Sequence, residues 1–196
     1  TYSLNTGSNQ NYFEFGEMFK GDYVIKVASV SDAENTADSD FTAELAVTKL
    51  SAPSISTFAV TENKLTWQAD SHASRYDIIL TIGENIVTDS VVTNEYTLPA
   101  SLSAGEFSYQ IKLIGDNTKY LTSDYSEIAY AEKLASPEFS LVKGELNWSS
   151  VANASGYILN INGTEIDLKK QTSYSFADYA SGNYNVRVKA LGGNAN

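Results

Sequence analysis

The sequence lacks cysteine altogether, so none of its 196 residues can form a disulfide or act through a thiolate. This absence fits a cytosolic protein, and it equally fits a bacterial surface protein that does without disulfides. No apolar run approaches the roughly 18 residues that a membrane-spanning helix needs, and no signal peptide is visible. The chain starts at Thr1, inside what reads as the middle of a repeat, so we expect it to be part of a longer array.

Basic residues are also scarce. The chain has 13 Lys and Arg against 24 Asp and Glu, which gives a formal net charge of -11 at pH 7. Such a chain repels nucleic acid and anionic lipid surfaces at long range, and the same charge favours solubility. Hydrophobic residues make up 42% of the chain, which is enough to bury a core and too much for a disordered segment.

What the sequence does contain is a stretch that occurs three times with small changes. The copies are "KGDYVIKVASV" at 20–30, "AGEFSYQIKLI" at 104–114 and "SGNYNVRVKAL" at 181–191. In each copy an aromatic residue stands two positions after a glycine, and these residues are Tyr23, Phe107 and Tyr184. In the last copy Tyr184, Val186 and Val188 alternate with polar residues, which is typical of a strand that is buried on one side.

Other segments return in the same order. "KLSAP" at 49–53 and "SDFT" at 39–42 return 84 positions later, as "KLASP" at 133–137 and "SDYS" at 123–126. The segment 64–80 returns at 145–161, so that Trp67 corresponds to Trp148 and Tyr76 to Tyr157. We therefore predict a repeat of about 84 residues, with the following three parts. Repeat A (residues 1–49) is the back part of one copy, repeat B (50–133) is complete, and repeat C (134–196) lacks its last strand.

Each joint between repeats is a short K-L-x-x-P stretch in which Pro53 or Pro137 opens the next first strand. Proline suits this place because the first residue of a strand needs no ladder donor and the ring stiffens the junction. Within repeat B the apolar residues alternate, with turn residues every 8–12 positions, as in a sandwich of short strands. The expected strands are 54–60, 63–69, 75–82, 85–93, 95–98, 106–114 and 126–132.

In this pattern Leu65 and Trp67 should face inward from the second strand, and Tyr76, Ile78 and Leu80 from the third. The segment "TAELAVTKL" at 42–50 is the nearest approach to a helical period. Its counterpart at 126–134 alternates instead, so we expect both segments to be last strands.

The segments "LTWQADSHASRYDIIL" and "LNWSSVANASGYILNI" resemble the L-x-W-x-x-V-x-x-A-x-x-Y stretch of fibronectin type III domains, especially those of bacterial surface and secreted proteins. The recurring G-x-Y stretch resembles the sixth strand of that family, whose tyrosine forms a corner by bonding back to upstream backbone. The resemblance implies tandem all-β, immunoglobulin-like sandwiches, one complete and two partial. Phe107 cannot make the corner hydrogen bond, so packing or Tyr109 should hold that corner.

The family resemblance covers the whole chain with uneven support. Repeat A lacks the strand that bears the tryptophan, and its membership rests on its back part, although "TYSLN" at 1–5 resembles "GYILN" in repeat C. Repeat B departs from the pattern after Ala69, where "DSH" replaces a valine-centred turn. If one blueprint underlies the repeats, Trp67 and Trp148 must lie in matching surroundings.

Three motifs have a functional and a plain interpretation. His72, the only histidine, lies beside Asp70 and Ser71, but adjacent residues of one loop cannot form a catalytic triad, so we expect a solvated loop. The acidic loop 31–40 contains Asp32, Glu34, Asp38 and Asp40. It lacks the calcium-binding spacing with its central glycine, and the sequence leaves calcium binding open. "KGD" at 20–22 resembles an adhesive tripeptide, although turn chemistry explains it.

Two further patterns are weaker still. Asn147, Asn153 and Asn162 stand in glycosylation sequons, but "NGT" at 162–164 is better explained as a hairpin turn. The thirteen tyrosines suggest a surface on which sugar rings could stack. The tryptophans are poor candidates for such a surface because we expect them to lie in the core. The less constrained rings are Tyr120, Tyr174 and Tyr179.

The sequence predicts a non-catalytic spacer or interaction module from an extracellular, cell-surface array, with a role in adhesion or surface assembly. The alternative is a carbohydrate- or protein-binding accessory module of a secreted enzyme. We expect no catalytic, cofactor-binding or metal-binding residues, no cofactor, no nucleic acid and no membrane insertion. The expected neighbours are further repeats of the same chain, and the protein or glycan partner stays open.

Overall fold

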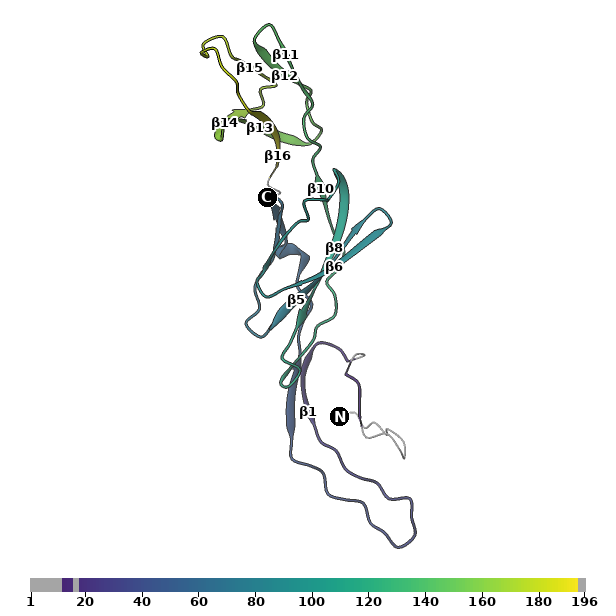
Figure 1. The fold of residues 1–196 in the computed structure, drawn as a ribbon. Helices are drawn as coiled ribbons and strands as arrows, with labels where there is room; N and C mark the ends of the chain where they lie inside the picture. The colour runs from purple at the N-terminus through teal and green to yellow at the C-terminus, as the bar shows by residue number, and fades with distance from the viewer. Residues whose placement is uncertain (1–11, 16–17, 194–196) are drawn as a thin grey trace.

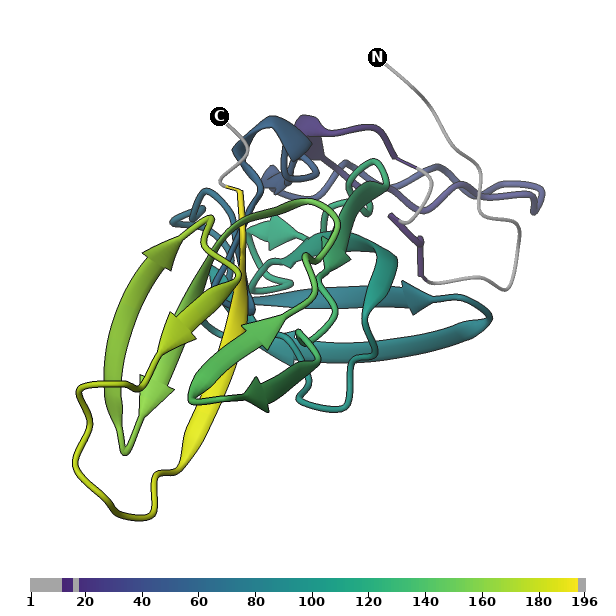
Figure 2. The ribbon, with the colours of Figure 1, turned by 90° about the horizontal axis from the view of Figure 1, so that it is seen from above.

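The computed structural model of the protein describes residues 12–15 and 18–193, so the segment at 1–5 lies outside the described residues. In the described part, every regular element is a β-strand except one turn of 3-10 helix, η1 (Ile55–Thr57). The expected all-β class is therefore confirmed. The three repeats follow one another along one axis, from the purple hairpin through the teal strands to the green and yellow ones (Figure 1). Figure 2 looks along this axis from above, with repeat C in front.

Repeat B is a sandwich of two antiparallel sheets. One sheet has the order β3-β4-β7, formed by Ala59–Thr61, Lys64–Thr66 and Glu95–Thr97. The other has the order β10-β8-β5-β6, formed by Ala129–Lys133, Gly105–Ile114, Arg75–Ile82 and Asn85–Val91. The inward residues of the two sheets form one buried cluster that includes Leu65, Trp67, Tyr76, Ile78 and Phe107. Burying a side chain of this size contributes roughly 1.5–3 kcal/mol, so the alternating pattern explains the sandwich.

The first expected strand of repeat B is only partly correct. Residues 55–57 form the 3-10 turn η1, and the strand β3 begins at Ala59. Both the backbone N–H and the hydroxyl of Thr57 donate to the carbonyl oxygen of Ser54, at 3.0 and 2.8 Å. Local bonds of this kind are available to Ser and Thr and compete with a strand ladder. Periodicity alone did not reveal this competition.

Repeat C has the same two layers. Its sheets are β11-β12-β15, formed by Phe139–Val142, Glu145–Trp148 and Ser173–Ser175, and β14-β13-β16, formed by Thr164–Lys169, Ala154–Ile161 and Val186–Gly192. The buried cluster between them includes Leu146, Trp148, Tyr157 and Leu159. The expected hairpin is confirmed, because Asn162 and Gly163 take φ values of 51° and 92° in the turn between β13 and β14. Positive φ at both central residues is what a type I′ turn requires.

Repeat A contributes a hairpin of β1 (Gly21–Ile25) and β2 (Leu45–Lys49). Its register pairs Gly21 with Lys49, just as Gly105 pairs with Lys133 in the hairpin of β8 and β10. The expected last strands near residues 50 and 134 are therefore confirmed as β2 and β10. The shared register shows that the repetition in sequence is also a repetition in structure.

The two tryptophans lie in matching surroundings. Trp67 meets Tyr76 edge-on at 5.2 Å between ring centroids, and Trp148 meets Tyr157 in the same way at 5.9 Å. The hydroxyl oxygen of each tyrosine accepts a backbone N–H from six residues earlier, from Asp70 at 3.0 Å and from Val151 at 2.8 Å. The expectation that one blueprint underlies both repeats is confirmed at these positions.

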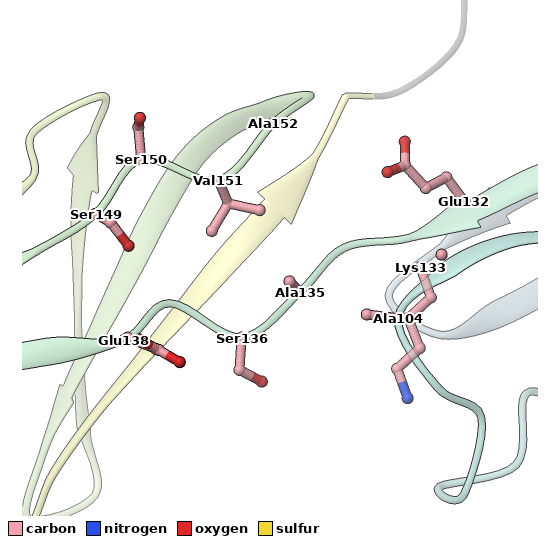
Figure 3. A pocket seen from close by; sticks show the side chains of 11 residues that line it. Ala104, Glu132, Lys133, Ala135, Ser136, Glu138, Ser149, Ser150, Val151 and Ala152 are labelled. Carbon is pink, nitrogen blue, oxygen red and sulfur yellow. The ribbon is translucent and has the colours of Figure 1, made fainter.

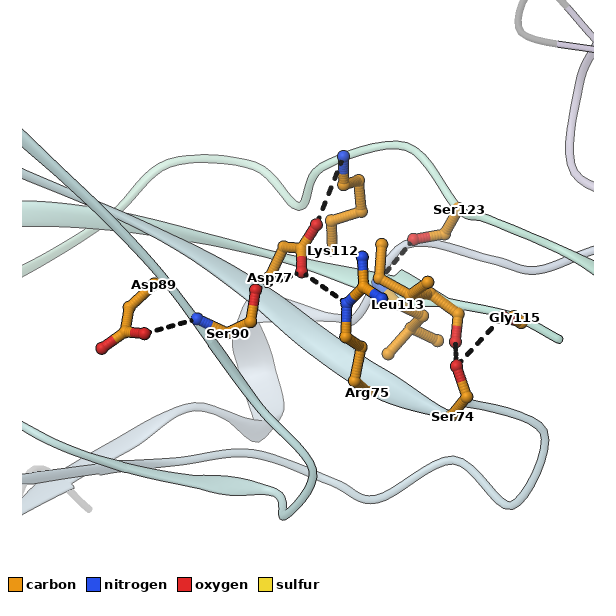
Figure 4. Close-up of polar contacts among 10 residues, drawn as sticks. Ser74, Arg75, Asp77, Asp89, Ser90, Lys112, Leu113, Gly115 and Ser123 are labelled. Atoms are coloured by element: carbon orange, nitrogen blue, oxygen red, sulfur yellow. Dashed lines mark hydrogen bonds and ion pairs between the residues drawn. The ribbon is translucent and has the colours of Figure 1, made fainter. Parts of the chain in front are cut away.

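A serine that precedes each of these tyrosines by two positions repeats as well. The hydroxyl of Ser74 reaches the carbonyl oxygens of Ile114 and Gly115 at 2.9 and 3.0 Å, as Figure 4 shows. The hydroxyl of Ser155 reaches those of Leu191 and Gly192 at 3.1 and 2.9 Å. These bonds tie the start of the third strand to the end of the sixth in both repeats.

The recurring motif, "SDFT" at 39–42 and "SDYS" at 123–126, also has a structural reason. The hydroxyl oxygens of Ser123 and Ser126 accept the backbone N–H groups of Leu113 and Ile111 at 2.9 and 3.1 Å. In repeat A, Ser39 and Thr42 accept those of Ser29 and Val27 at 2.9 and 3.1 Å. In repeat B the hydroxyls thus satisfy backbone donors of β8 at the buried residues Leu113 and Ile111. In repeat A the two donors lie after the end of β1 and are exposed.

The tyrosine corner is present where the sequence allows it. The hydroxyl of Tyr184 donates to the carbonyl oxygen of Ala180 at 3.0 Å, and that of Tyr23 donates to Phe19 at 2.6 Å. Phe107 is almost fully buried and packs 6.1 Å from the ring of Tyr109, so packing holds its corner as expected.

No helix in the described part of the chain is long and apolar enough to cross a membrane.

Candidate functional site at the two joints

The first joint, between repeats A and B, is built by strand addition. A short strand, β9 (Tyr120–Leu121), leaves the body of repeat B and pairs in parallel with the end of β2. The backbone N–H of Thr48 donates to the oxygen of Lys119 at 2.8 Å, and that of Leu50 donates to the oxygen of Leu121 at 3.1 Å. The two repeats therefore share the three-stranded sheet β1-β2-β9.

A buried lysine crosses the same joint. The side chain of Lys49 is only 4% exposed, and its ammonium lies 2.9 Å from the carboxylate of Asp124, which is 70% exposed. The lysine side chain is thereby buried at the joint while its charge reaches a solvated partner. Because the carboxylate is screened by water, we expect packing rather than charge to supply most of the stability.

The loop that carries β9 is held in shape by Asp116. One carboxylate oxygen accepts the backbone N–H groups of Thr118, Lys119 and Tyr120 at 2.8–2.9 Å. These three hydrogen bonds, first the one from Tyr120, hold the pKa of Asp116 far below its usual value. At Gly115 a Cβ would lie 1.9 Å from the oxygen of Tyr120, so only glycine lets the loop return so closely.

His72 lies at this joint. Its ring stacks on Tyr120 with centroids 4.2 Å apart, and its Nδ1 is 3.2 Å from the carboxylate of Asp70. The ammonium of Lys119 lies 5.2 Å from the centroid of the Tyr120 ring. The histidine is half-exposed, and its contacts give it a structural place beside β9. That it takes no catalytic role stays a prediction.

The second joint, between repeats B and C, is more open. The side-chain amide of Asn153 donates to the carboxylate of Glu132 at 2.7 Å across it. The ammonium of Lys133, the counterpart of Lys49, instead donates to the oxygen of Leu102 within its own repeat. A hollow of about 450 Å³ lies at the joint (Figure 3). It is lined by Ala104, Gly105, Glu132, Lys133, Ala135, Ser136, Glu138, Ser149, Ser150, Val151 and Ala152.

A polar network covers part of the outer face of the four-stranded sheet in repeat B (Figure 4). Asp77 lies 3.2 Å from Arg75, accepts the hydroxyl of Ser90 at 2.7 Å and is 3.8 Å from Lys112. Partial burial raises the pKa of Asp77, but the hydrogen bonds from Ser90 and Arg75 and the charges of Arg75 and Lys112 outweigh it and leave the pKa lowered. The carboxylate is well compensated, as in a structural ion-pair cluster.

The remaining motifs are spread over the surface. The acidic loop 31–40 is exposed except at Ser31, and the carboxylate of Asp38 accepts the N–H of Ser31 at 2.9 Å. Within residues 12–15 and 18–193, no three His, Cys, Asp or Glu side chains are placed to share a metal ion. The absence of metal binding stays a prediction. In the "KGD" segment, Gly21 has a φ of 143° and Asp22 accepts the hydroxyl of Thr48 at 2.6 Å.

The three less constrained tyrosines all have partners within the chain. Tyr120 lies at the first joint beside His72. The hydroxyls of Tyr174 and Tyr179 lie 2.9 Å apart, and both rings pack against the buried cluster of repeat C. The three rings therefore do not form one stacking surface. Of the sequons, Asn147 lies in β12 as expected, and Asn153 and Asn162 lie in turns with positive φ.

Sequence reasoning missed the residues that build the first joint. One signal was present, because "GDN" at 115–117 is a typical turn initiator. The pairing of Lys49 with Asp124 had no local signal, because the two residues are 75 positions apart.

A scan of the sequence against protein-family models finds no match, and a search of curated proteins finds none either. Among solved structures, the chain is similar to the chicken CNTN1 FN1-FN3 domains at 12% identity and a TM-score of 0.39, over 87% of this chain and 72% of that one. It is also similar to the central fibronectin-III array of RIM-binding protein at 14% identity and a TM-score of 0.30, over 72% of this chain and 58% of that one. At these TM-scores, the sandwich description rests on the chain's own strand pairing and cores.

Proposed function

We propose that this chain is a non-catalytic spacer and interaction module within a longer array of β-sandwich repeats. The observation that carries the proposal is the addition of β9 of repeat B to the sheet of repeat A, through backbone bonds from Thr48 and Leu50. A linker alone would leave the two repeats free to reorient, which is the usual behaviour of neighbouring domains. Backbone pairing across the joint instead fixes their relative direction and so maintains a distance.

We further propose that the array lies outside the cell, either on the surface of a bacterium or in a protein that the bacterium secretes. Its proposed role is in adhesion or surface assembly. The lack of cysteine and the net charge of -11 support a soluble module that needs no disulfides. The proposed units are residues 1–49, 50–133 and 134–196, joined at the K-L-x-x-P stretches. No residue of the chain is assigned a catalytic, cofactor-binding or metal-binding role.

The proposal is tested by measuring whether repeats A and B tumble as one body. Residual dipolar couplings of residues 18–49 and 50–133 should fit a single alignment tensor. Thr48→Pro removes the N–H that faces β9 and should split the couplings into two tensors. Thr48→Val keeps this N–H, loses only the hydroxyl bond to Asp22, and should retain the single tensor. Two different tensors in the unaltered chain would rule out the stiff spacer.

A further inference from the structure

The strand β6 forms an open edge of the larger sheet in repeat B. Among the described residues it pairs only with β5, as the last strand of the order β10-β8-β5-β6. The hairpin of β5 and β6 projects from the body of the repeat (Figure 1). Every residue from Asn85 to Ser90 is exposed, and two apolar side chains, Ile86 at 68% and Val87 at 37%, lie among them. An open edge of this kind is a template for pairing with another strand.

The corresponding edge of repeat C is protected. Its strand β14 carries three charged residues in six, Glu165, Asp167 and Lys169, and its pairing with β13 has a register shift. Charges and bulges of this kind commonly keep strand edges from associating. The ladder of β6 has no such shift over its seven pairs, and Asp89 is the only charged residue in the strand. The edge of repeat B therefore lacks most of the protection that the edge of repeat C has.

The free hydrogen-bonding groups of this edge belong to alternate residues. The turn before β6 has two residues, so the first pair of the hairpin is a hydrogen-bonded one. Bonded and non-bonded pairs alternate in an antiparallel ladder, so the backbone groups of Ile86, Thr88 and Ser90 point to the open edge. The N–H of Ser90 already donates to the carboxylate of Asp89 at 2.8 Å. Within the described part of the chain, Ile86 and Thr88 therefore each keep one N–H and one C=O without a strand partner.

The side chains of β6 complement those of a second copy of β6 in one antiparallel register. If Ile86 lies opposite Thr88 of the second copy, the two Val87 side chains meet across a two-fold axis. The exposed apolar side chains of Ile86 and Val87 are then both covered by β-branched neighbours, which favour each other in a sheet. Asp89 lies opposite the neutral amide of Asn85, so this register places no charge opposite a like charge.

The two neighbouring symmetric registers fit less well. A register centred on Thr88 brings Val87 opposite Asp89 and needs the N–H of Ser90, which is already bonded. A register centred on Asp89 places the two carboxylates directly opposite each other, which is destabilising. The register centred on Val87 is therefore the one that uses the free backbone groups and pairs apolar side chains with each other.

We propose that β6 is a docking edge for a second copy of this chain, which pairs antiparallel with it in the register centred on Val87. Ile86 of each copy exchanges two backbone hydrogen bonds with Thr88 of the other, so the two sheets become one continuous sheet. A single strand pair is a small contact beside the roughly 1,200 Å² that stable interfaces bury. Each copy also carries a net charge of -11, so the association is weak and strengthens as salt screens this charge. This inference goes beyond the spacer role and does not depend on the first joint.

Single cysteine variants test the register directly, because the chain has no cysteine of its own. Val87→Cys places two thiols in a non-hydrogen-bonded pair with Cα atoms about 4.5 Å apart, a distance that a disulfide can bridge. With oxidised glutathione as the oxidant, this variant should form a covalent dimer at least about tenfold faster than Val92→Cys. Val92 is 80% exposed, so its variant controls for random collision. Thr88→Cys should also be slow, because its diagonal separation of about 7–8 Å exceeds the range of a disulfide.

The unaltered chain gives an independent measurement. As its concentration is raised at high salt, the amide signals of Ile86 and Thr88 should shift and their hydrogen exchange should slow. Thr88→Pro removes one of the free donors at an edge that tolerates proline, and it should abolish the shift at Ile86. Thr88→Val keeps the donor and should behave like the unaltered chain.

Each of three results would overturn the proposal. The first is an equal rate of dimer formation in Val87→Cys and Val92→Cys. The second is faster dimer formation in Thr88→Cys than in Val87→Cys, which would indicate another register. The third, which needs no variant to fold, is the absence of any concentration-dependent change at Ile86 and Thr88 in the unaltered chain. All three leave the dipolar couplings across the first joint unaffected, so failure here is distinct from failure of the spacer role.

Discussion

The two joints of this chain have nearly the same sequence and different construction. Both are K-L-x-x-P stretches, starting at Lys49 and Lys133. Across the first, backbone bonds from Thr48 and Leu50 join β2 to β9, and Lys49 reaches Asp124. Across the second, the described residues provide the hydrogen bond between Asn153 and Glu132 beside an open hollow. The backbone bonds of the first joint come from outside the linker, from the loop that follows the sixth strand of repeat B, and the counterpart of this loop in repeat C follows Gly192.

The element that builds the first joint is this loop of repeat B. In repeat B this loop runs from Gly115 to Leu121 and folds back far enough to pair with the preceding repeat. A proline in the linker restrains one backbone torsion, whereas the added strand contributes two hydrogen bonds between repeats. We therefore expect the stiffness of the first joint to be set by a loop that is far from the linker in sequence.

The largest effect is expected from Gly115→Ala. The new Cβ would lie 1.9 Å from the backbone oxygen of Tyr120, and because this neighbour is backbone the loop must move. We expect repeat B to lose about 2 kcal/mol or more of its free energy of unfolding, measured by urea denaturation, together with the pairing of β9. The protection of the Thr48 and Leu50 amides against hydrogen exchange should fall at the same time.

Gly192→Ala is the matched control, because Gly192 accepts the hydroxyl of Ser155 as Gly115 accepts that of Ser74. No atom of the described residues lies within 4 Å of a Cβ at Gly192, so this variant should change stability by less than about 0.5 kcal/mol. Equal costs at the two glycines would contradict the difference between the loops.

Most of the sandwich was predictable from the sequence. The third strand at 75–82 matches β5 at both ends, and Leu65, Trp67 and Tyr76 are buried as their alternation predicted. These features depend on a two-residue period that the sequence displays directly. The 3-10 turn η1 was missed because it depends on a local hydroxyl bond from Thr57, which competes with a pattern that otherwise favours a strand.

The joint was not predictable in the same way. Asp124 was seen only as part of a recurring motif, and its contact with Lys49 depends on how two repeats meet. Parallel pairing between segments about 70 residues apart leaves no periodic trace in either one. The role of Asp116 had a local signal in "GDN", but the sequence does not say what the ordered loop then contacts.

A second, smaller effect is expected from Asp116→Ala. The variant removes the acceptor of three backbone N–H groups, so the loop should lose its shape and the amides of Thr48 and Leu50 should exchange several-fold faster after correction for intrinsic rates. The pKa of Asp116 is lowered in the folded chain, so its contribution is fully present above its unfolded pKa of about 4 and is lost as pH falls toward the folded pKa. The first joint should therefore weaken in acid below about pH 4.

The variant also supplies the control for the acid effect. Asp116→Ala has no carboxyl group at this position, so the amide protection of Thr48 and Leu50 should no longer depend on its titration. The difference in amide protection between the variant and the unaltered chain should therefore shrink as the pH is lowered. Protection that stays equal in both chains at neutral pH would show that other contacts order the loop.

The smallest effect is expected from Lys49→Met. Methionine keeps most of the buried aliphatic volume of the lysine, and the lost ion pair ends on Asp124, which is 70% exposed and screened by water. The free energy of unfolding should change by less than about 1 kcal/mol, and the exchange of the Thr48 and Leu50 amides should be nearly unchanged.

Lys133→Met, at the corresponding position of the second joint, is the control. A cost of about 3 kcal/mol or more at Lys49 alone would mean that the ammonium is held in a poorly hydrated site, because breaking a buried pair is costly in that way. A small cost leaves the backbone pairing of β2 and β9 as the interaction that distinguishes the first joint from the second.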